Sequence, residues 1–65
     1  MKLSIPDMSC GHCKATVERT IAAVDPAAKV TVDLASRTAD VTTGATAEAI
    51  LAALQAEGYP ATPAA

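Results

Sequence analysis

The spacing of apolar residues alternates between a strand pattern and a helix pattern along this chain of 65 residues. In residues 2–6, Leu3 and Ile5 alternate with polar side chains, as in a half-buried strand. From residue 11 the spacing becomes helical, with an apolar stripe made of Val17, Ile21 and Val24. Asp25 precedes a proline and therefore predicts the end of this helix, because such a residue avoids helical backbone angles.

The same two patterns return in the second half. Residues 30–34 and 38–42 both alternate and are separated by a short turn, so they predict a hairpin. Thr46 is a favourable N-cap for a second helix. The apolar stripe of that helix consists of Ala47, Ile50, Leu51 and Leu54.

The C-terminal segment carries signals for a helix cap and a last strand. Gly58 stands where a left-handed C-terminal cap is expected, and Tyr59 would then pack back near Leu54. We expect residues 59–62 to form a short fourth strand and residues 63–65 to be a frayed tail.

The order strand, helix, strand, strand, helix, strand predicts an α+β fold of the ferredoxin-like βαββαβ class. Its two βαβ halves interlock as a four-stranded antiparallel sheet with both helices on one face. At this length the chain buries only a small core, so residues 1–65 are expected to form one domain.

Charge and composition exclude several classes of function. The net charge is −2, and the chain has one Tyr but no Phe or Trp, which argues against nucleic-acid binding. No apolar run reaches the length of a transmembrane helix, so no membrane insertion is expected. The N-terminal residues lack a signal-peptide pattern, and we therefore expect a cytoplasmic protein, in which a CxxC pair is metal-binding or catalytic rather than structural.

The pair in question is Cys10 and Cys13, in the stretch MSCGHC between the first strand and the first helix. Cys10 would lie in the loop and Cys13 in the first helical turn, where free N–H groups and the helix dipole favour the thiolate. Structural zinc requires four ligands, but the chain has two Cys and one His in all. Two exposed thiolates instead suit a soft ion such as Cu(I), held for transfer rather than for storage.

MSCGHC followed by KATVERTIAAV resembles the heavy-metal-associated domain family. The resemblance continues through VTVDL at residues 30–34, ADV at 39–41 and EGY at 57–59, and it is greatest to the free-standing bacterial copper chaperones. It implies that Cys10 and Cys13 are the Cu(I) ligands, with Tyr59 beside them on the loop after the second helix. It also implies a non-enzymatic Cu(I) chaperone that passes copper to the related domain of a P-type copper ATPase.

One departure from the family pattern concerns the choice of metal. The family usually has Gly before the Met of the motif, where this chain has Asp7. Zinc-carrying relatives have a carboxylate immediately before the first Cys, where this chain has Ser9. At that position the sequence favours copper over zinc.

The neighbours of the two cysteines each allow two interpretations. Met8 is either a third, thioether ligand or a core residue below the loop. His12 is either an exposed imidazole or an auxiliary ligand, in a copper-bridged homodimer or together with bound glutathione. Tyr59 either belongs to the helix cap or shields the sulfur atoms.

Two alternative functions remain open. CGHC is also the active-site tetrapeptide of protein disulfide isomerases, so a small dithiol-disulfide oxidoreductase is one alternative. Against it, those enzymes have an aromatic residue at the position of Ser9, and a thioredoxin domain is longer than this chain. The other alternative is an excised N-terminal metal-binding domain of a copper ATPase.

Overall fold

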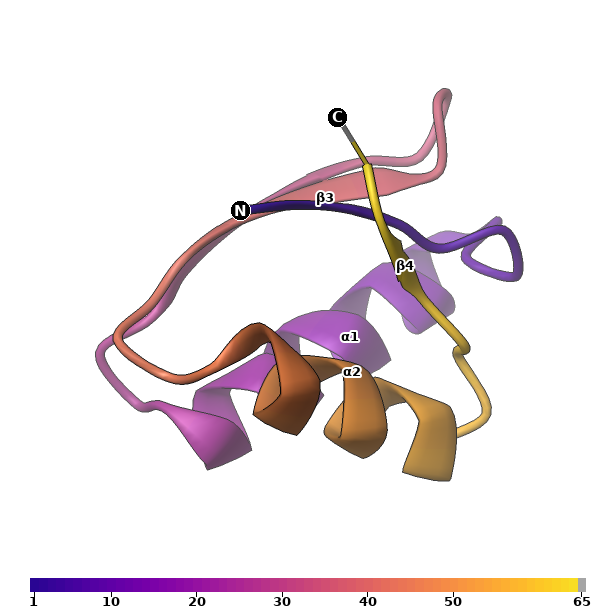
Figure 1. Ribbon diagram of the computed structural model, residues 1–65. Helices are drawn as coiled ribbons and strands as arrows, with labels where there is room; N and C mark the ends of the chain where they lie inside the picture. The colour runs from indigo at the N-terminus through magenta and orange to yellow at the C-terminus, as the bar shows by residue number, and fades with distance from the viewer. Residues whose placement is uncertain (65) are drawn as a thin grey trace.

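The computed structural model describes residues 1–64, in which four strands form one sheet and two helices cover one of its faces (Figure 1). The elements in chain order are β1 (Lys2–Ser4), α1 (Gly11–Val24), β2 (Lys29–Asp33), β3 (Thr38–Thr42), α2 (Ala47–Ala56) and β4 (Thr62–Pro63). The strand order is β2-β3-β1-β4, and every neighbouring pair is antiparallel. This confirms the predicted ferredoxin-like fold.

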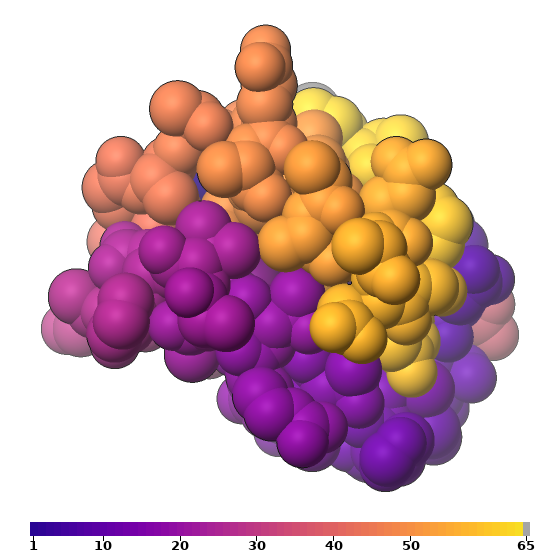
Figure 2. Space-filling model, turned by 90° about the horizontal axis from the view of Figure 1, so that it is seen from below, coloured from indigo at the N-terminus to yellow at the C-terminus, as the bar shows by residue number. Residues whose placement is uncertain are grey.

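The core lies between the sheet and the helices, which contact each other along the underside of the molecule (Figure 2). Its buried apolar residues are Leu3, Ile5, Met8, Val17, Ile21, Ala39, Val41, Ile50 and Leu54. The predicted stripe of α1 points into this core, and so do Ile50, Leu51 and Leu54 of α2, although Val24 and Leu51 are only half-buried. Ala47, which the sequence assigned to the α2 stripe, is instead exposed at the first position of the helix. No polar or charged side chain is buried within residues 1–64.

The predicted helix boundaries are confirmed in detail at both ends of α2. The N–H of Ala49 donates to Oγ1 of Thr46 at 3.2 Å, which is the expected N-cap contact. Gly58 has φ of 86°, and the N–H groups of Gly58 and Tyr59 donate to the carbonyls of Gln55 and Leu54 at 3.0 and 2.9 Å. This pair of bonds is a Schellman motif, and it fixes where the chain leaves the helix.

The last strand lies later in the chain than the sequence predicts. The structure has β4 at Thr62–Pro63, with Thr62 opposite Ser4. The N–H of Ala64 donates to the carbonyl of Lys2 at 2.8 Å, so the chain remains paired beyond Pro63 rather than frayed. Residues 59–61 form the connection from the end of α2 to the edge of the sheet. Proline at position 60 has no N–H group, so it cannot donate a hydrogen bond to a neighbouring strand. The last residue of the predicted tail, 65, lies outside the described residues.

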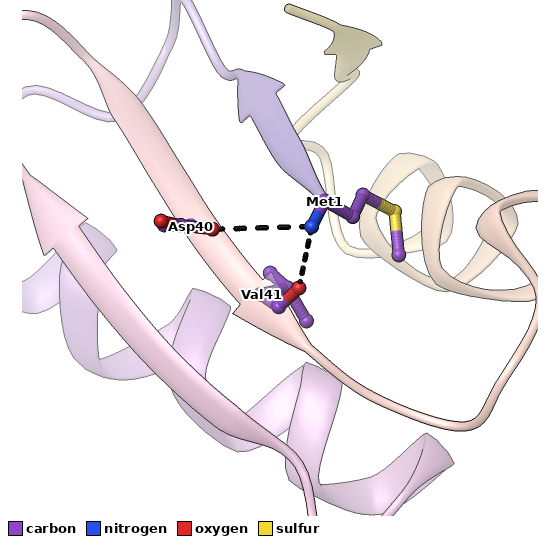
Figure 3. Close-up of polar contacts among 3 residues, drawn as sticks. All are labelled: Met1, Asp40 and Val41. Atoms are coloured by element: carbon purple, nitrogen blue, oxygen red, sulfur yellow. Dashed lines mark hydrogen bonds and ion pairs between the residues drawn. The ribbon is translucent and has the colours of Figure 1, made fainter.

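The β1–β3 ladder continues to the first residue (Figure 3). The amino group of Met1 donates to the carbonyl of Val41 at 2.9 Å, and the N–H of Val41 donates back to the Met1 carbonyl at 2.6 Å. The same amino group lies 3.9 Å from a carboxylate oxygen of Asp40. These contacts fix the start of β1, which carries the candidate site at its other end.

Neither helix is long and apolar enough to cross a membrane, as far as residues 1–64 are concerned.

Candidate metal centre

The loop from β1 to α1 is held at its base by the β2–β3 turn. The N–H of Ile5 donates to the carbonyl of Arg37 at 2.8 Å, and the Arg37 guanidinium donates to the carbonyl of Pro6 at 3.2 Å. Arg37 makes both contacts from a left-handed backbone conformation, with φ of 56°. Sequence reasoning missed this residue, because arginine gives no signal for a conformation in which Asn or Gly is usual.

Met8 lies beneath the loop and is fully buried in the core. Its N–H donates to the carbonyl of Ile5 at 3.0 Å, which closes a tight turn. Ser9 and Cys10, the next two residues, are exposed. This arrangement favours the core interpretation of Met8, in which an apolar side chain supports the outward-facing part of the loop from below.

Cys10 is the N-cap of α1, and Cys13 lies in the first turn of that helix, as the sequence predicted. Cys10 has extended backbone angles, and its sulfur accepts a 3.4 Å hydrogen bond from the N–H of Cys13. The two Sγ atoms lie 3.0 Å apart as free thiols. Cys10 is exposed and Cys13 is half-buried, so the pair converges at the surface.

The surroundings of Cys13 lower the pKa of its thiol from 9.0 to about 7. The largest cause is the hydrogen bond with the Cys10 side chain, followed by the hydroxyl of Tyr59 and the backbone of Ser9. Each of these donors stabilises the thiolate more than the thiol, and together they outweigh the opposing effect of desolvation. A substantial fraction of Cys13 is therefore ionised at neutral pH, as a metal ligand or nucleophile requires.

Tyr59 lies beside the two cysteines, where the Schellman motif places it. Its side chain is half-buried against the core. The interaction with Cys13 raises the pKa of the Tyr59 phenol, because a hydroxyl that donates to a thiolate holds its proton more firmly. Tyr59 therefore belongs to the helix cap and interacts with Cys13, the more buried cysteine, while its role as a shield of the sulfur atoms stays a prediction.

His12 is exposed in the first turn of α1. No group of three or more His, Cys, Asp or Glu side chains gathers into a possible metal site in residues 1–64. Neither His12 nor Asp7 therefore completes a larger ligand set with the two cysteines in the described structure. What the fold brings together is a pair of sulfur donors near the surface, and this type and number of donors suits a soft ion.

Comparison with known proteins points to one family. The sequence model of the heavy-metal-associated domain matches residues 2–60 of this chain. Comparison with curated protein sequences gave no match.

Solved structures of several metal-handling proteins superpose closely on this one. A gold binding protein is 48% identical, with a TM-score of 0.91 and 94% of each chain covered. The copper chaperone Atx1 from Synechocystis PCC6803 is 27% identical, with a TM-score of 0.92, covering 95% of this chain and 98% of its own. Oxidised MerP from Ralstonia metallidurans CH34 is 33% identical, with a TM-score of 0.85, covering 94% of this chain and 89% of its own. Since the family model spans nearly the whole sequence and the same fold recurs in these proteins, the chain belongs to the heavy-metal-associated domain family.

Proposed function

We propose that this protein is a Cu(I) chaperone that holds one copper ion between the sulfur atoms of Cys10 and Cys13. The observation that carries the proposal is the pair of free thiols, 3.0 Å apart and facing solvent at the start of α1. Family membership and the chaperone relatives support a role in metal binding. Two thiolates satisfy Cu(I), and the open third position leaves room for an incoming ligand.

Transfer of copper then proceeds by ligand exchange. A thiolate of the acceptor bonds to the Cu(I) ion, which becomes three-coordinate, and one Cys–copper bond of the donor breaks. A second exchange releases the other cysteine, and each released thiolate regains a proton according to its pKa. Copper remains Cu(I) throughout and no substrate bond is made or broken, so the protein acts as a carrier rather than an enzyme.

The acceptor we propose is the related metal-binding domain of a P-type copper ATPase. Copper-loaded copies can also pair as a bridged homodimer, in which exposed His12 or a glutathione thiol supplies an extra ligand. The cytoplasm is the proposed location, because thiols stay reduced there and a dithiol site needs both sulfurs free.

A specific observation favours Au(I) as a second candidate cargo. The gold binding protein is 48% identical to this chain, considerably more than the copper chaperone Atx1 at 27%. Au(I) is also a soft ion that thiolates bind well, so a site built from two sulfurs does not by itself discriminate between the two metals.

The decisive experiment is a Cu(I) titration of the reduced protein against a chromogenic chelator, with Au(I) and Zn(II) competitions run in parallel. We expect tight Cu(I) uptake that is lost in both Cys10→Ala and Cys13→Ala, while their far-ultraviolet circular dichroism stays native. Ser9→Ala is the matched control, because Ser9 is exposed between Met8 and Cys10 and its side chain is no soft ligand.

Three results of this experiment would reject or redirect the proposal. Retained Cu(I) affinity in both cysteine variants would exclude the dithiolate site. Au(I) displacing Cu(I) at equal concentration would reassign the cargo to gold. Weak metal binding combined with catalytic disulfide reduction would establish the dithiol-disulfide oxidoreductase instead.

A further inference from the structure

The two edges of the sheet differ in how open they are to another strand. One edge is β4, which has two residues and contains Pro63, a residue without an amide hydrogen. The other edge is β2, which has five residues and no proline, with β3 as its one neighbour in residues 1–64. One row of N–H and C=O groups of β2 therefore faces away from the sheet, and such an edge can accept another strand.

The sequence of β2, KVTVD, is complementary to itself when it runs antiparallel to a second copy. With Thr31 of both copies at the centre, Lys29 of each copy stands opposite Asp33 of the other. In the same register Val30 stands opposite Val32. Opposite charges and β-branched residues in directly facing positions both stabilise antiparallel pairs, so a two-fold symmetric contact is favoured at every position.

The side chains of β2 are available for such a contact. Lys29, Thr31 and Asp33 are exposed, and neither charged residue forms an ion pair within the described residues. One oxygen of the Asp33 carboxylate accepts from the N–H groups of Ala35 and Ser36, so the other oxygen is the one that can face Lys29 of a second copy. Val30 and Val32 pack against the core but are only half-buried. A second strand alongside would cover more of both valines, which is favourable because apolar area leaves water.

We propose that the protein self-associates through antiparallel pairing of β2 with β2 of a second copy, which joins the two sheets into one. β1 and β2 run in the same direction, since each is antiparallel to β3. The loop with Cys10 and Cys13 therefore lies towards the Asp33 end of β2, and antiparallel pairing sends the two loops to opposite ends of the dimer. The contact is independent of metal and goes beyond the proposed function.

The test is sedimentation velocity of the reduced, metal-free protein over a concentration series. A contact of one short strand is small, so we expect a weak dimer seen as a sedimentation coefficient that rises with concentration. Thr31→Lys should abolish this rise, because it places like charges directly opposite each other at the two-fold axis. Lys29→Glu should do the same by placing acidic groups opposite Asp33.

Thr62→Lys is the matched control, since it makes the same change at an exposed threonine on the other edge strand. We expect this variant, and the double variant Cys10→Ala/Cys13→Ala, to self-associate like the original protein. Circular dichroism on each variant confirms that the fold is retained. A protein that stays monomeric at every concentration would overturn the proposal, as would loss of association in Thr62→Lys or in the cysteine double variant.

Discussion

The backbone N–H of Cys13 donates to Sγ of Cys10, and the same Sγ atom lies 3.0 Å from Sγ of Cys13. One turn of helix thus binds the two residues together before any metal arrives. Because Cys10 caps α1, the geometry of the dithiol depends on where that helix begins rather than on distant contacts. A metal ion that bonds to both sulfurs has to move them apart from 3.0 Å, because two metal–sulfur bonds of roughly 2.3 Å at a wide angle span a longer distance.

The thiol pKa of Cys13 offers a direct test of this geometry in the metal-free protein. Cys10→Ala should raise that pKa above its value of about 7, because it removes the strongest stabilising contact of the thiolate. Tyr59→Phe should raise it by a smaller amount, since the Tyr59 hydroxyl is the second cause. The pH dependence of ultraviolet thiolate absorbance measures both shifts.

The control for these titrations is Ser9→Ala. Ser9 acts on Cys13 through its backbone, so removal of its hydroxyl should leave the pKa of Cys13 in place. A Tyr59→Phe variant with an unchanged or lower pKa would show that the phenol does not donate to the thiolate.

Met8 should matter for stability and not for metal affinity. Met8→Ala should lower the free energy of unfolding by about 2–5 kcal/mol, because it opens a cavity in a fully buried position. Met8→Leu nearly conserves volume and should cost less than about 1.5 kcal/mol. Urea denaturation measures both values. Cu(I) competition on Met8→Leu then decides the role of the sulfur: weakened binding by a folded variant would make Met8 a ligand.

Local chemistry explains why most of the fold was predictable. The proline after Asp25, the N-cap Thr46 and Gly58 each act within one turn of the helix end that they determine, so sequence alone located those ends. The place of Cys10 and Cys13 followed from the same signals, because the motif stands where the first strand gives way to α1.

Contacts between distant segments explain what was missed. The register of β4 depends on how many residues the chain needs to travel from the cap at Gly58 to β1, and no local signal carries that length. The contacts of Arg37 with Ile5 and Pro6 join residues about thirty positions apart, and no local sequence pattern predicts them either. The interaction of Tyr59 with Cys13 belongs to the same class: family resemblance implied that the two residues are close, but the effect of Tyr59 on the thiol pKa required the folded chain.

Gly58 should be hard to replace for reasons of backbone conformation alone. Its φ is 86°, and a Cβ atom at this position would meet no other atom within 4 Å. Gly58→Ala should therefore destabilise the protein by about 1–2 kcal/mol through left-handed backbone strain. Gly44→Ala is the control, since Gly44 also has free space but no positive φ. Thermal or urea unfolding that shows equal effects for both variants would contradict this assignment.

Asp25 should make stability depend on pH in the acid range. It joins the end of α1 to the loop before α2: one carboxylate oxygen accepts from the Thr43 hydroxyl at 2.6 Å and from the N–H of Gly44 at 3.2 Å. The other accepts from the N–H of Ala27 at 3.0 Å. These bonds hold the pKa of the Asp25 carboxyl below its ordinary value of 3.8, with Thr43 as the largest cause.

The sign of the effect follows from linkage. Because the folded state holds the pKa of Asp25 below that of the unfolded state, the stabilisation is fully present above pH 3.8 and is lost as pH falls through the lower, folded-state value. The difference in free energy of unfolding between the original protein and Asp25→Ala, measured by urea denaturation, should therefore be constant near neutral pH and shrink in acid. Thr43→Val should move the pKa of Asp25 upward, and with it the pH at which stability is lost. A difference that stays constant down to the lowest pH at which the protein folds would show that the charge on Asp25 does not contribute to stability.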